Sequence, residues 1–379
     1  MLSLFLACAS VKSPDTVDEN RPDLVCPGDE YCQIAGEGPV LVGASAVTIT
    51  PTCLESWSDD DEDNKYRASR DTFFDCGCDQ LCPEDEGYTG PDEGEADGVF
   101  QTAWLAGFGN GRAVSSVHDD IWSRTITFRQ GDVSLALVSV DLVGYFNDDI
   151  QRLNDAVSAA GLDFDHIIVS STHVHSAPDV LGQWGRQLGE TGRNHEYLDY
   201  LQARIVESIR IADDSAQAAT MKVGAIDVAT YDPGKGTRNV IHDHRDPKII
   251  DPMLNVAKFS NDSGETIASL LNFGNHPEVL DASTLWLTSD FVDATRRGVE
   301  QGVIYPDYSV DGVGGVCVYV SAAVGGMMSP LQVEVSDGSG QSYRESSFEK
   351  SDALGNVMAE LALQALASAE PESLSLAFA

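Results

Sequence analysis

Hydrophobic and polar positions along most of this chain alternate in short blocks that favour strands and helices in turn. Short apolar runs rich in Val, Ile and Leu predict buried strands at 40–51, 125–128, 133–140, 166–169, 221–228, 255–259, 266–273 and 316–320. Apolar residues spaced three or four apart predict helices over 148–160, 196–212, 290–301 and 347–368, and we expect Ser289 to cap the third. Interleaved elements of this kind predict an α/β fold, or a mixed α+β fold, with central sheets flanked by helices. No internal repeat is visible in the sequence.

The first hundred residues interrupt this pattern. Residues 1–10 look like the end of an export signal, with Cys8 placed as in a lipoprotein, and residues 11–39 are polar enough to be a linker. An acidic, Cys-rich loop insertion at 52–97 then separates the first strand from the rest. We therefore expect one main domain at 40–370, interrupted by this insertion and followed by a short tail at 371–379.

Cysteine usage favours an exported bacterial protein, whether periplasmic, secreted or held at the outer membrane as a lipoprotein. Six cysteines fall close together in an acidic loop region, which is typical of disulfides in exported proteins. They are Cys26, Cys32, Cys53, Cys76, Cys78 and Cys82. A zinc knot is the alternative for the last three, but no histidine lies nearby. Cys317 lies inside an apolar strand, and we expect it to be a buried, inert thiol.

The net charge of −38 argues against a nucleic acid partner, because binding phosphates requires a surplus of Lys and Arg. Residues 1–100 carry 23 Asp and Glu against 5 Lys and Arg, which favours solubility and cation binding. The acidic run at 59–64 offers oxygen ligands suited to Ca²⁺, although it lacks the EF-hand spacing.

No apolar run is long enough to span a membrane, and the sequence carries no signal for an oligomeric state.

Reactive side chains directly follow three of the apolar strands. His173 and His175 come after the strand that ends near 169, His276 after the 266–273 strand, and Ser329 after the 316–320 strand. Residues i and i+2 of an extended segment point to the same side, so both imidazoles of the His-x-His pair face one space. Open sheets bind ligands beyond the ends of their strands. Two or three imidazoles with a carboxylate suit Zn²⁺, whereas a structural or surface role is the competing interpretation of the pair.

A glycine-rich turn lies ahead of these strands. It reads Gly107-Phe108-Gly109-Asn110-Gly111, and no Gly-Lys-Ser or Gly-Lys-Thr follows it, so it is not a phosphate-binding loop.

Four motifs in unbroken order resemble the N-terminal catalytic domain of the neutral/alkaline, non-lysosomal ceramidases. Residues 172–178 read Thr-His-Val-His-Ser-Ala-Pro, which is similar to that family's Thr-His-Thr-His-Ser-Gly-Pro. His276-Pro277 with Ser289-Asp290 is similar to its His-Pro and Ser-Asp segment, residues 327–330 to its serine motif, and residues 237–239 to its Asn-Arg-Ser segment. The resemblance covers about residues 40–51 and 100–370.

The resemblance implies an exported, zinc-dependent amidohydrolase. Such an enzyme hydrolyses the N-acyl amide of ceramide or a related lipid at a membrane surface, giving a sphingoid base and a fatty acid. His173 and His276 would be zinc ligands, and His175 would face the substrate's amide oxygen or a proton in transfer. Arg238 would bind the substrate or stabilise negative charge, and Ser329 would be the family's essential serine.

The chain also departs from the family pattern. The family's remaining zinc ligands, a Glu and a Tyr, come well after the serine motif, whereas this chain ends about 50 residues after Ser329. We therefore consider His118, Asp141, Glu278 and Asp290 as additional ligands. The serine motif also lacks the family's Asp and Asn. Two alternative functions follow: a degenerate, non-catalytic relative that binds cations or lipids, and a zinc hydrolase for another amide or ester.

Overall fold

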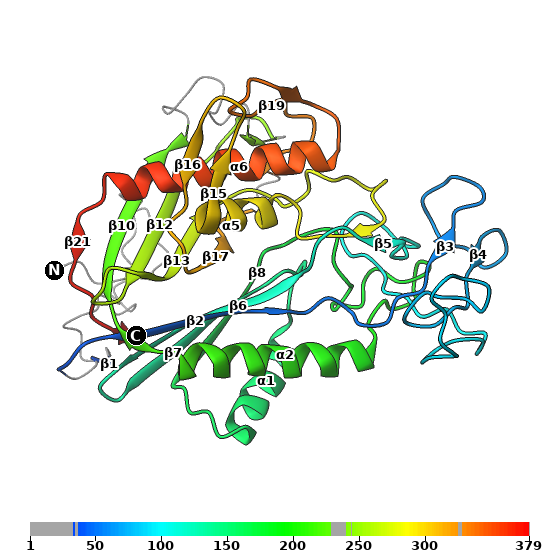
Figure 1. Ribbon diagram of the computed structural model, residues 1–379, viewed down its shortest axis with the longest axis horizontal. Coiled ribbons are helices and arrows are strands. Elements are labelled where there is room, and N and C mark those ends of the chain that lie inside the picture. Colours follow the sequence, from blue (N-terminus) through cyan, green and yellow to red (C-terminus); the bar gives the residue numbers. More distant parts are fainter. Residues whose placement is uncertain (1–32, 35–36, 229–239, 244, 325–327, 379) are drawn as a thin grey trace.

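Two five-stranded sheets packed face to face, with helices on both outer faces, form the body of the protein (Figure 1). This architecture comes from a computed structural model that describes residues 33–34, 37–228, 240–243, 245–324 and 328–378. The predicted fold, with central sheets flanked by helices, is confirmed. Within the described residues, no helix combines the length and apolar character needed to cross a bilayer.

The first sheet has the strand order β8-β7-β6-β2-β9. Its neighbours pair antiparallel except β7 and β8, which are parallel. Its strands are β2 (Leu41–Thr48), β6 (Trp122–Gln130), β7 (Val133–Val140), β8 (His166–Ser171) and β9 (Gln217–Ala218). Helix α1 (Asn147–Ala159) connects β7 to β8, and α2 (His195–Asp214) follows β8. The side chain of Asn194 caps α2 by accepting two backbone N–H groups. Every residue of β7 is buried, as expected for a central strand covered on both faces.

The second sheet has the order β17-β13-β12-β10-β21, in which only β13 and β17 are parallel. Its strands are β10 (Thr220–Asp227), β12 (Met253–Ser260), β13 (Thr266–Phe273), β17 (Val316–Ser321) and β21 (Pro371–Glu372). Helix α5 (Phe291–Gln301) connects β13 to β17, and α6 (Phe348–Ala367) follows. Strand order and connections therefore repeat those of the first sheet. The fold contains a repeat of topology that the sequence does not display.

Three apolar cores separate the four layers. Between the sheets, Phe128 and Leu137 of the first sheet share a buried cluster with Phe259 and Val318 of the second. A second cluster joins the first sheet to α1 and α2, and a third joins the second sheet to α5 and α6. Figure 1 shows α1 and α2 on one outer face and α5 and α6 on the other. Helices α1 and α2 each bury one apolar stripe, which is why helical spacing located them in the sequence, whereas α6 is buried over most of its circumference.

One predicted cap is wrong. Helix α5 is capped by Asp290, whose carboxylate accepts the Phe291 N–H, and not by Ser289. The single proton of the Ser289 hydroxyl is instead shared between the Asp141 carboxylate (2.8 Å) and the backbone carbonyl of Asp120 (2.9 Å). Both residue types are good caps, and the fold selects the one whose carboxylate also accepts the N–H groups of Val279 and Leu280.

Short two-stranded ribbons fill the remaining connections. They pair β1 (Gln33–Ile34) with β22 (Ala377–Phe378), β3 (Trp57–Ser58) with β4 (Thr72–Phe73), β5 (Ser116–Val117) with β14 (Trp286–Leu287), β11 (His242–Asp243) with β18 (Met328–Ser329), β15 (Gly302–Ile304) with β16 (Ser309–Asp311), and β19 (Val335–Ser336) with β20 (Ser342–Tyr343).

The acidic insertion is held together by two disulfides and a small aromatic core. Cys53 pairs with Cys78 and Cys76 with Cys82, which confirms the prediction of disulfides for these four residues. Cys26 and Cys32 lie outside the described residues. Trp57 and Tyr66 of the insertion share a buried cluster with Ala113 and Leu285 of the main body. Cys317 is a free, buried thiol, as expected.

A buried ion pair ties the two halves together. Asp141 follows the last residue of β7, and both its carboxylate oxygens accept from the Arg296 guanidinium of α5, at 2.9 and 2.8 Å. The two side chains are 0% and 1% exposed. The Trp122 N–H and the Ser289 hydroxyl also donate to the carboxylate, so its lone pairs are satisfied. A fully hydrogen-bonded, bidentate pair of this kind fixes α5 against the end of the first sheet.

We expect Arg296→Met to lower the free energy of unfolding by about 3–5 kcal/mol, because it leaves the buried Asp141 carboxylate without its cationic partner. The neighbouring Arg297 is a matched control, since it is 50% exposed and pairs with Asp293 and Asp352 at the surface. Arg297→Met should change stability by less than about 1 kcal/mol. Urea denaturation of the two variants measures both values, and similar small losses in both would contradict this role for the buried pair.

Candidate metal centre

Three imidazoles from both halves of the fold meet at one edge of the two sheets. His173 and His175 follow β8 of the first sheet, and His276 follows β13 of the second. The ring centroid of His173 lies 5.0 Å from that of His175 and 4.8 Å from that of His276. The centroids of His175 and His276 are 5.6 Å apart. One ring nitrogen from each residue lies within 4.8 Å of the other two. This spacing suits three ligands around one metal ion.

His173 is oriented by its backbone and by one hydrogen bond. Its φ of 69° lies in the left-handed region, which a residue other than glycine adopts only where its surroundings hold it there. Its Nδ1 lies 2.6 Å from the backbone carbonyl oxygen of Val143, so Nδ1 carries the proton and donates. Nε2 is then left with a free lone pair, the form in which histidine binds a metal. Burial lowers the pKa of His173, which keeps the ring neutral.

His175 carries the strongest indication of a ligand. Both of its ring nitrogens are buried, and neither has a hydrogen-bond partner within the described structure. Burial, with smaller contributions from the two neighbouring histidines and Arg112, lowers the pKa of His175 to about 3. A neutral, buried imidazole without partners requires an explanation, and a metal ion supplies one. Its Nδ1 also lies 3.5 Å from the Glu278 carboxylate, which is placed to orient the ring.

Backbone hydrogen bonds connect the two histidine segments directly. The His175 N–H donates to the Pro277 carbonyl (3.3 Å), and the Thr288 N–H donates to the Ser176 carbonyl (3.0 Å). The convergence of the imidazoles therefore depends on hydrogen bonding between the halves as well as on the sheets that carry them.

The glycine-rich turn packs directly against His175, a role that the sequence analysis missed. A Cβ on Gly107, whose φ is +105°, would lie 2.6–2.8 Å from three side-chain atoms of His175. The Phe108 ring contacts the same imidazole edge-on, with centroids 4.9 Å apart. Only glycine leaves room for the ring at position 107. The signal in the sequence was the glycine repeat itself, because such turns also allow close approach of a side chain.

Arg112 ends this turn and was also missed. Its buried guanidinium donates to the backbone carbonyls of Ala106 (3.0 Å), His175 (3.1 Å) and Thr284 (2.7 Å). One side chain thus ties together the turn, the histidine segment and the loop before β14. Burial lowers the pKa of Arg112 to about 10, so it stays charged near neutral pH.

Three other residues considered as ligands lie in a separate network. Asp141 pairs with Arg296, as described above. The buried Asp290 carboxylate accepts the N–H groups of Val279, Leu280 and Phe291, and burial raises its pKa to about 7. His118 stacks on Phe348 with centroids 3.8 Å apart, and its Nδ1 lies 2.7 Å from Asp119. Of the four candidate ligands, only Glu278 is brought beside the three imidazoles.

Ser329 is buried in β18, opposite His242 of β11, and its hydroxyl accepts the Leu331 N–H (3.1 Å). Arg238 lies outside the described residues. In the acidic insertion, carboxylates of Asp59, Asp61 and Asp71 approach within 4.8 Å of one another. The Asp71 carboxylate accepts backbone N–H groups of Asp60 and Arg67, and Asp61 pairs with Arg70. Calcium binding there stays a prediction.

No protein-family model matches this sequence, and no curated protein matches it. Among solved structures, neutral ceramidase from Pseudomonas aeruginosa is similar, with a TM-score of 0.61, 15% identity, and coverage of 88% of this chain and 45% of that one. A ceramidase complexed with C2 is similar with a TM-score of 0.57, 15% identity, and coverage of 88% and 44%. This chain has a neutral ceramidase-like fold. It spans less than half the length of either ceramidase.

We expect Gly107→Ala to displace the His175 ring and to weaken binding of a divalent metal at least about tenfold, since the added Cβ overlaps the imidazole and the backbone is strained. Gly109→Ala is the matched control, because a Cβ there has no heavy atom within 4 Å. Titration of the metal-free variants with Co²⁺ or Zn²⁺ measures the difference. Equal metal affinity in the two variants would remove His175 from the site.

Metal affinity should also depend only weakly on pH in the mildly acidic range. An imidazole with an ordinary pKa near 6.5 loses about tenfold in metal affinity for each pH unit below that value, because protons compete for the lone pair. The pKa of His175 is lowered to about 3, so this ring stays neutral as the pH falls through 6.5, and the lowered pKa of His173 weakens proton competition at the second ring. Chelator competition should show that metal affinity falls by no more than about tenfold in total between about pH 6.5 and pH 5.5. A loss of several hundredfold would mean that the rings titrate normally.

Proposed function

We propose that this protein is an exported, zinc-dependent amidohydrolase that cleaves the N-acyl amide of ceramide or a related lipid. The observation that carries the proposal is the meeting of three half-buried imidazoles, two of them with lowered pKa values, at the strand ends of a neutral ceramidase-like fold. The resemblance of the histidine, serine and arginine motifs supports the same reaction.

The metal ligands that we propose are His173 and His276, as the resemblance implies, together with His175. The unpartnered nitrogens of His175 favour it as a third ligand, and Glu278 would accept from its Nδ1 to complete a carboxylate–histidine–metal arrangement. The carboxylates of Asp141 and Asp290 are occupied by other donors, which argues against them as ligands.

A zinc ion held by these histidines would supply a Lewis acid, which can polarise a carbonyl and lower the pKa of water to about 7. The chain's own residues would do the rest. Arg112 and the turn at Gly107 hold His175 in place, and Phe108 shields it with an apolar ring. Ser329 and Arg238 take the roles that the resemblance implies, Ser329 as the essential serine and Arg238 in binding the substrate or stabilising negative charge on the amide oxygen. Water adds across the C–N bond, and the products are a free amine and a fatty acid.

Export is supported by the two disulfides, since such bonds persist in oxidising compartments. A lipid amide substrate would then be met at a membrane surface outside the cytoplasm.

Metal content and activity of four variants test this proposal together. We expect His173→Ala and His276→Ala to lose bound zinc and hydrolysis, because each removes a ligand. Ser329→Ala should keep near-stoichiometric zinc and lose hydrolysis at least about a hundredfold. His195→Ala is the control, since this exposed histidine lies at the start of α2 and should retain both zinc and activity. Zinc bound equally by all four variants would contradict the assigned ligands.

Substrate class is tested separately with a short-chain fluorescent ceramide and a simple N-acyl amino acid. Preference for the ceramide supports the proposal. Preference for the N-acyl amino acid favours a zinc hydrolase of another amide. Stoichiometric zinc without hydrolysis of either favours the non-catalytic, cation-binding or lipid-binding alternative.

A further inference from the structure

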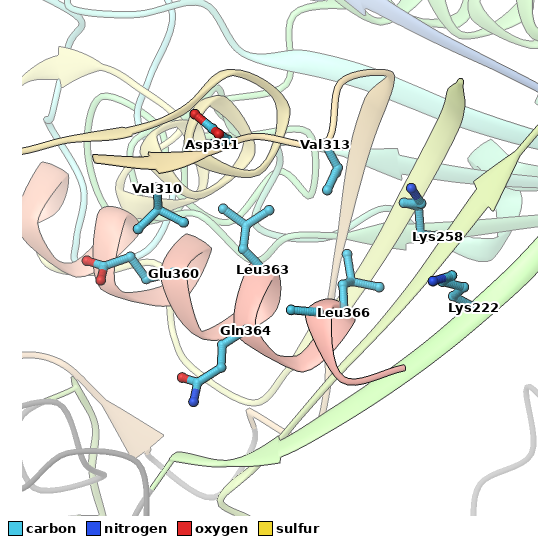
Figure 2. Close-up of a pocket in the computed structure, with 10 residues that line it drawn as sticks. Lys222, Lys258, Val310, Asp311, Val313, Glu360, Leu363, Gln364 and Leu366 are labelled. Carbon is cyan, nitrogen blue, oxygen red and sulfur yellow. The ribbon is translucent and has the colours of Figure 1, made fainter. Parts of the chain in front are cut away.

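A cavity of about 460 Å³ lies beside the last turns of α6, on the outer face of the second sheet. This volume is in the range of small-molecule sites. Figure 2 shows its construction: β10 and β12 supply two lysines, whereas α6 and the segment around β16 supply mainly aliphatic side chains. The aliphatic residues are Val310, Val313, Leu363, Leu366 and Ala367.

Lys222 and Lys258 lie directly opposite each other in the antiparallel pairing of β10 with β12. Both lysines lie on the face of the sheet that packs against α6. Leu254 and Val256 of β12 are buried on the same face. Like charges in directly opposite positions destabilise a sheet. Neither lysine has an ion-pair partner among the residues that the structure describes. Juxtaposed lysines are unexpected in a chain with seven lysines and a net charge of −38, where acidic partners are abundant.

The two acidic residues at the cavity do not neutralise this pair. The buried Glu360 carboxylate accepts the hydroxyls of Tyr305 (2.7 Å) and Tyr308 (3.1 Å). Asp311 is exposed on β16, and Figure 2 shows its carboxylate pointing away from both lysines. Two neighbouring ammonium groups therefore face an aliphatic wall, an arrangement complementary to a molecule with an anionic head and an apolar chain.

We propose that this cavity binds one fatty acid, with its carboxylate between Lys222 and Lys258 and its acyl chain along the aliphatic wall. A carboxylate has two oxygens and can accept from both ammonium groups at once. The site is separate from the metal centre. Lys258 lies opposite Ser269 of β13, seven residues before His276, which places it roughly 20 Å away along the strand direction.

The biological meaning of this site rests on the proposed function, because a fatty acid is the acid product of lipid amide hydrolysis. Binding itself does not depend on that reaction. A second site for the acyl product would retain it on the protein after it leaves the metal centre.

Calorimetric titration of the full chain with sodium dodecanoate tests the proposal. We expect one molecule bound per chain, at least about tenfold weaker binding in Lys222→Met and in Lys258→Met, and a larger loss in the double variant. Lys65→Met is the control, since this exposed lysine lies in the acidic insertion and should leave binding unchanged. Val313→Trp keeps both charges but fills the cavity, and should also abolish binding.

Several results would overturn the proposal. They are the absence of saturable binding, unchanged binding in the double lysine variant, equal affinity for 1-dodecanol, and equal affinity for inorganic phosphate. A lower melting temperature of the lysine variants with unchanged dodecanoate binding would assign the lysines to the C-terminal dipole of α6 instead. All of these variants should hydrolyse ceramide normally. Lysine-dependent dodecanoate binding in a protein that does not hydrolyse ceramide would contradict the proposed function and support this site. Ceramide hydrolysis without lysine-dependent dodecanoate binding would support the proposed function and contradict this site.

Discussion

The structure depends on one constraint: three imidazoles from two separate halves of the chain share a half-buried space, and burial lowers the pKa values of His173 and His175. Removing a histidine from water disfavours its protonated form, and neighbouring imidazoles add to that effect. A metal ion bound by the lone pairs of His173 and His175 would require both rings to be held in fixed positions. Much of the surrounding structure serves this requirement. The Val143 carbonyl fixes the tautomer of His173, Glu278 lies beside His175, and Gly107 and Arg112 fix the position of His175.

The repeated topology explains how distant segments reach one edge. Each half places a parallel strand pair, β7–β8 or β13–β17, at one edge of its sheet, and one helix connects the two strands of the pair. Stacking the sheets brings the ends of β8 and β13 together. The Asp141–Arg296 pair then joins the two halves, and the backbone bond from His175 to Pro277 joins them again at the histidines.

Much of this could be predicted from the sequence, because strand and helix periodicity reflects burial on one face. The helices at 148–160, 196–212 and 347–368 were located within two residues of their observed ends, since their apolar residues recur at helical spacing. The histidines were found because they follow apolar strands directly. The roles of Gly107 and Arg112 were not predictable, since they depend on contacts between segments more than sixty residues apart. The topological repeat was also hidden, because strand order depends on pairing and not on local pattern. Asp290 replaced Ser289 as the cap because its carboxylate satisfies a neighbouring turn as well.

The most direct test of the metal centre is X-ray absorption spectroscopy at the zinc edge on the purified, zinc-loaded chain. Our interpretation predicts a first shell with three imidazole nitrogens at about 2.0–2.1 Å and no sulfur, and one fewer imidazole in His175→Ala. A shell with fewer than two imidazoles, or one dominated by thiolate or carboxylate ligands, would contradict the central claim that these three histidines meet around one ion.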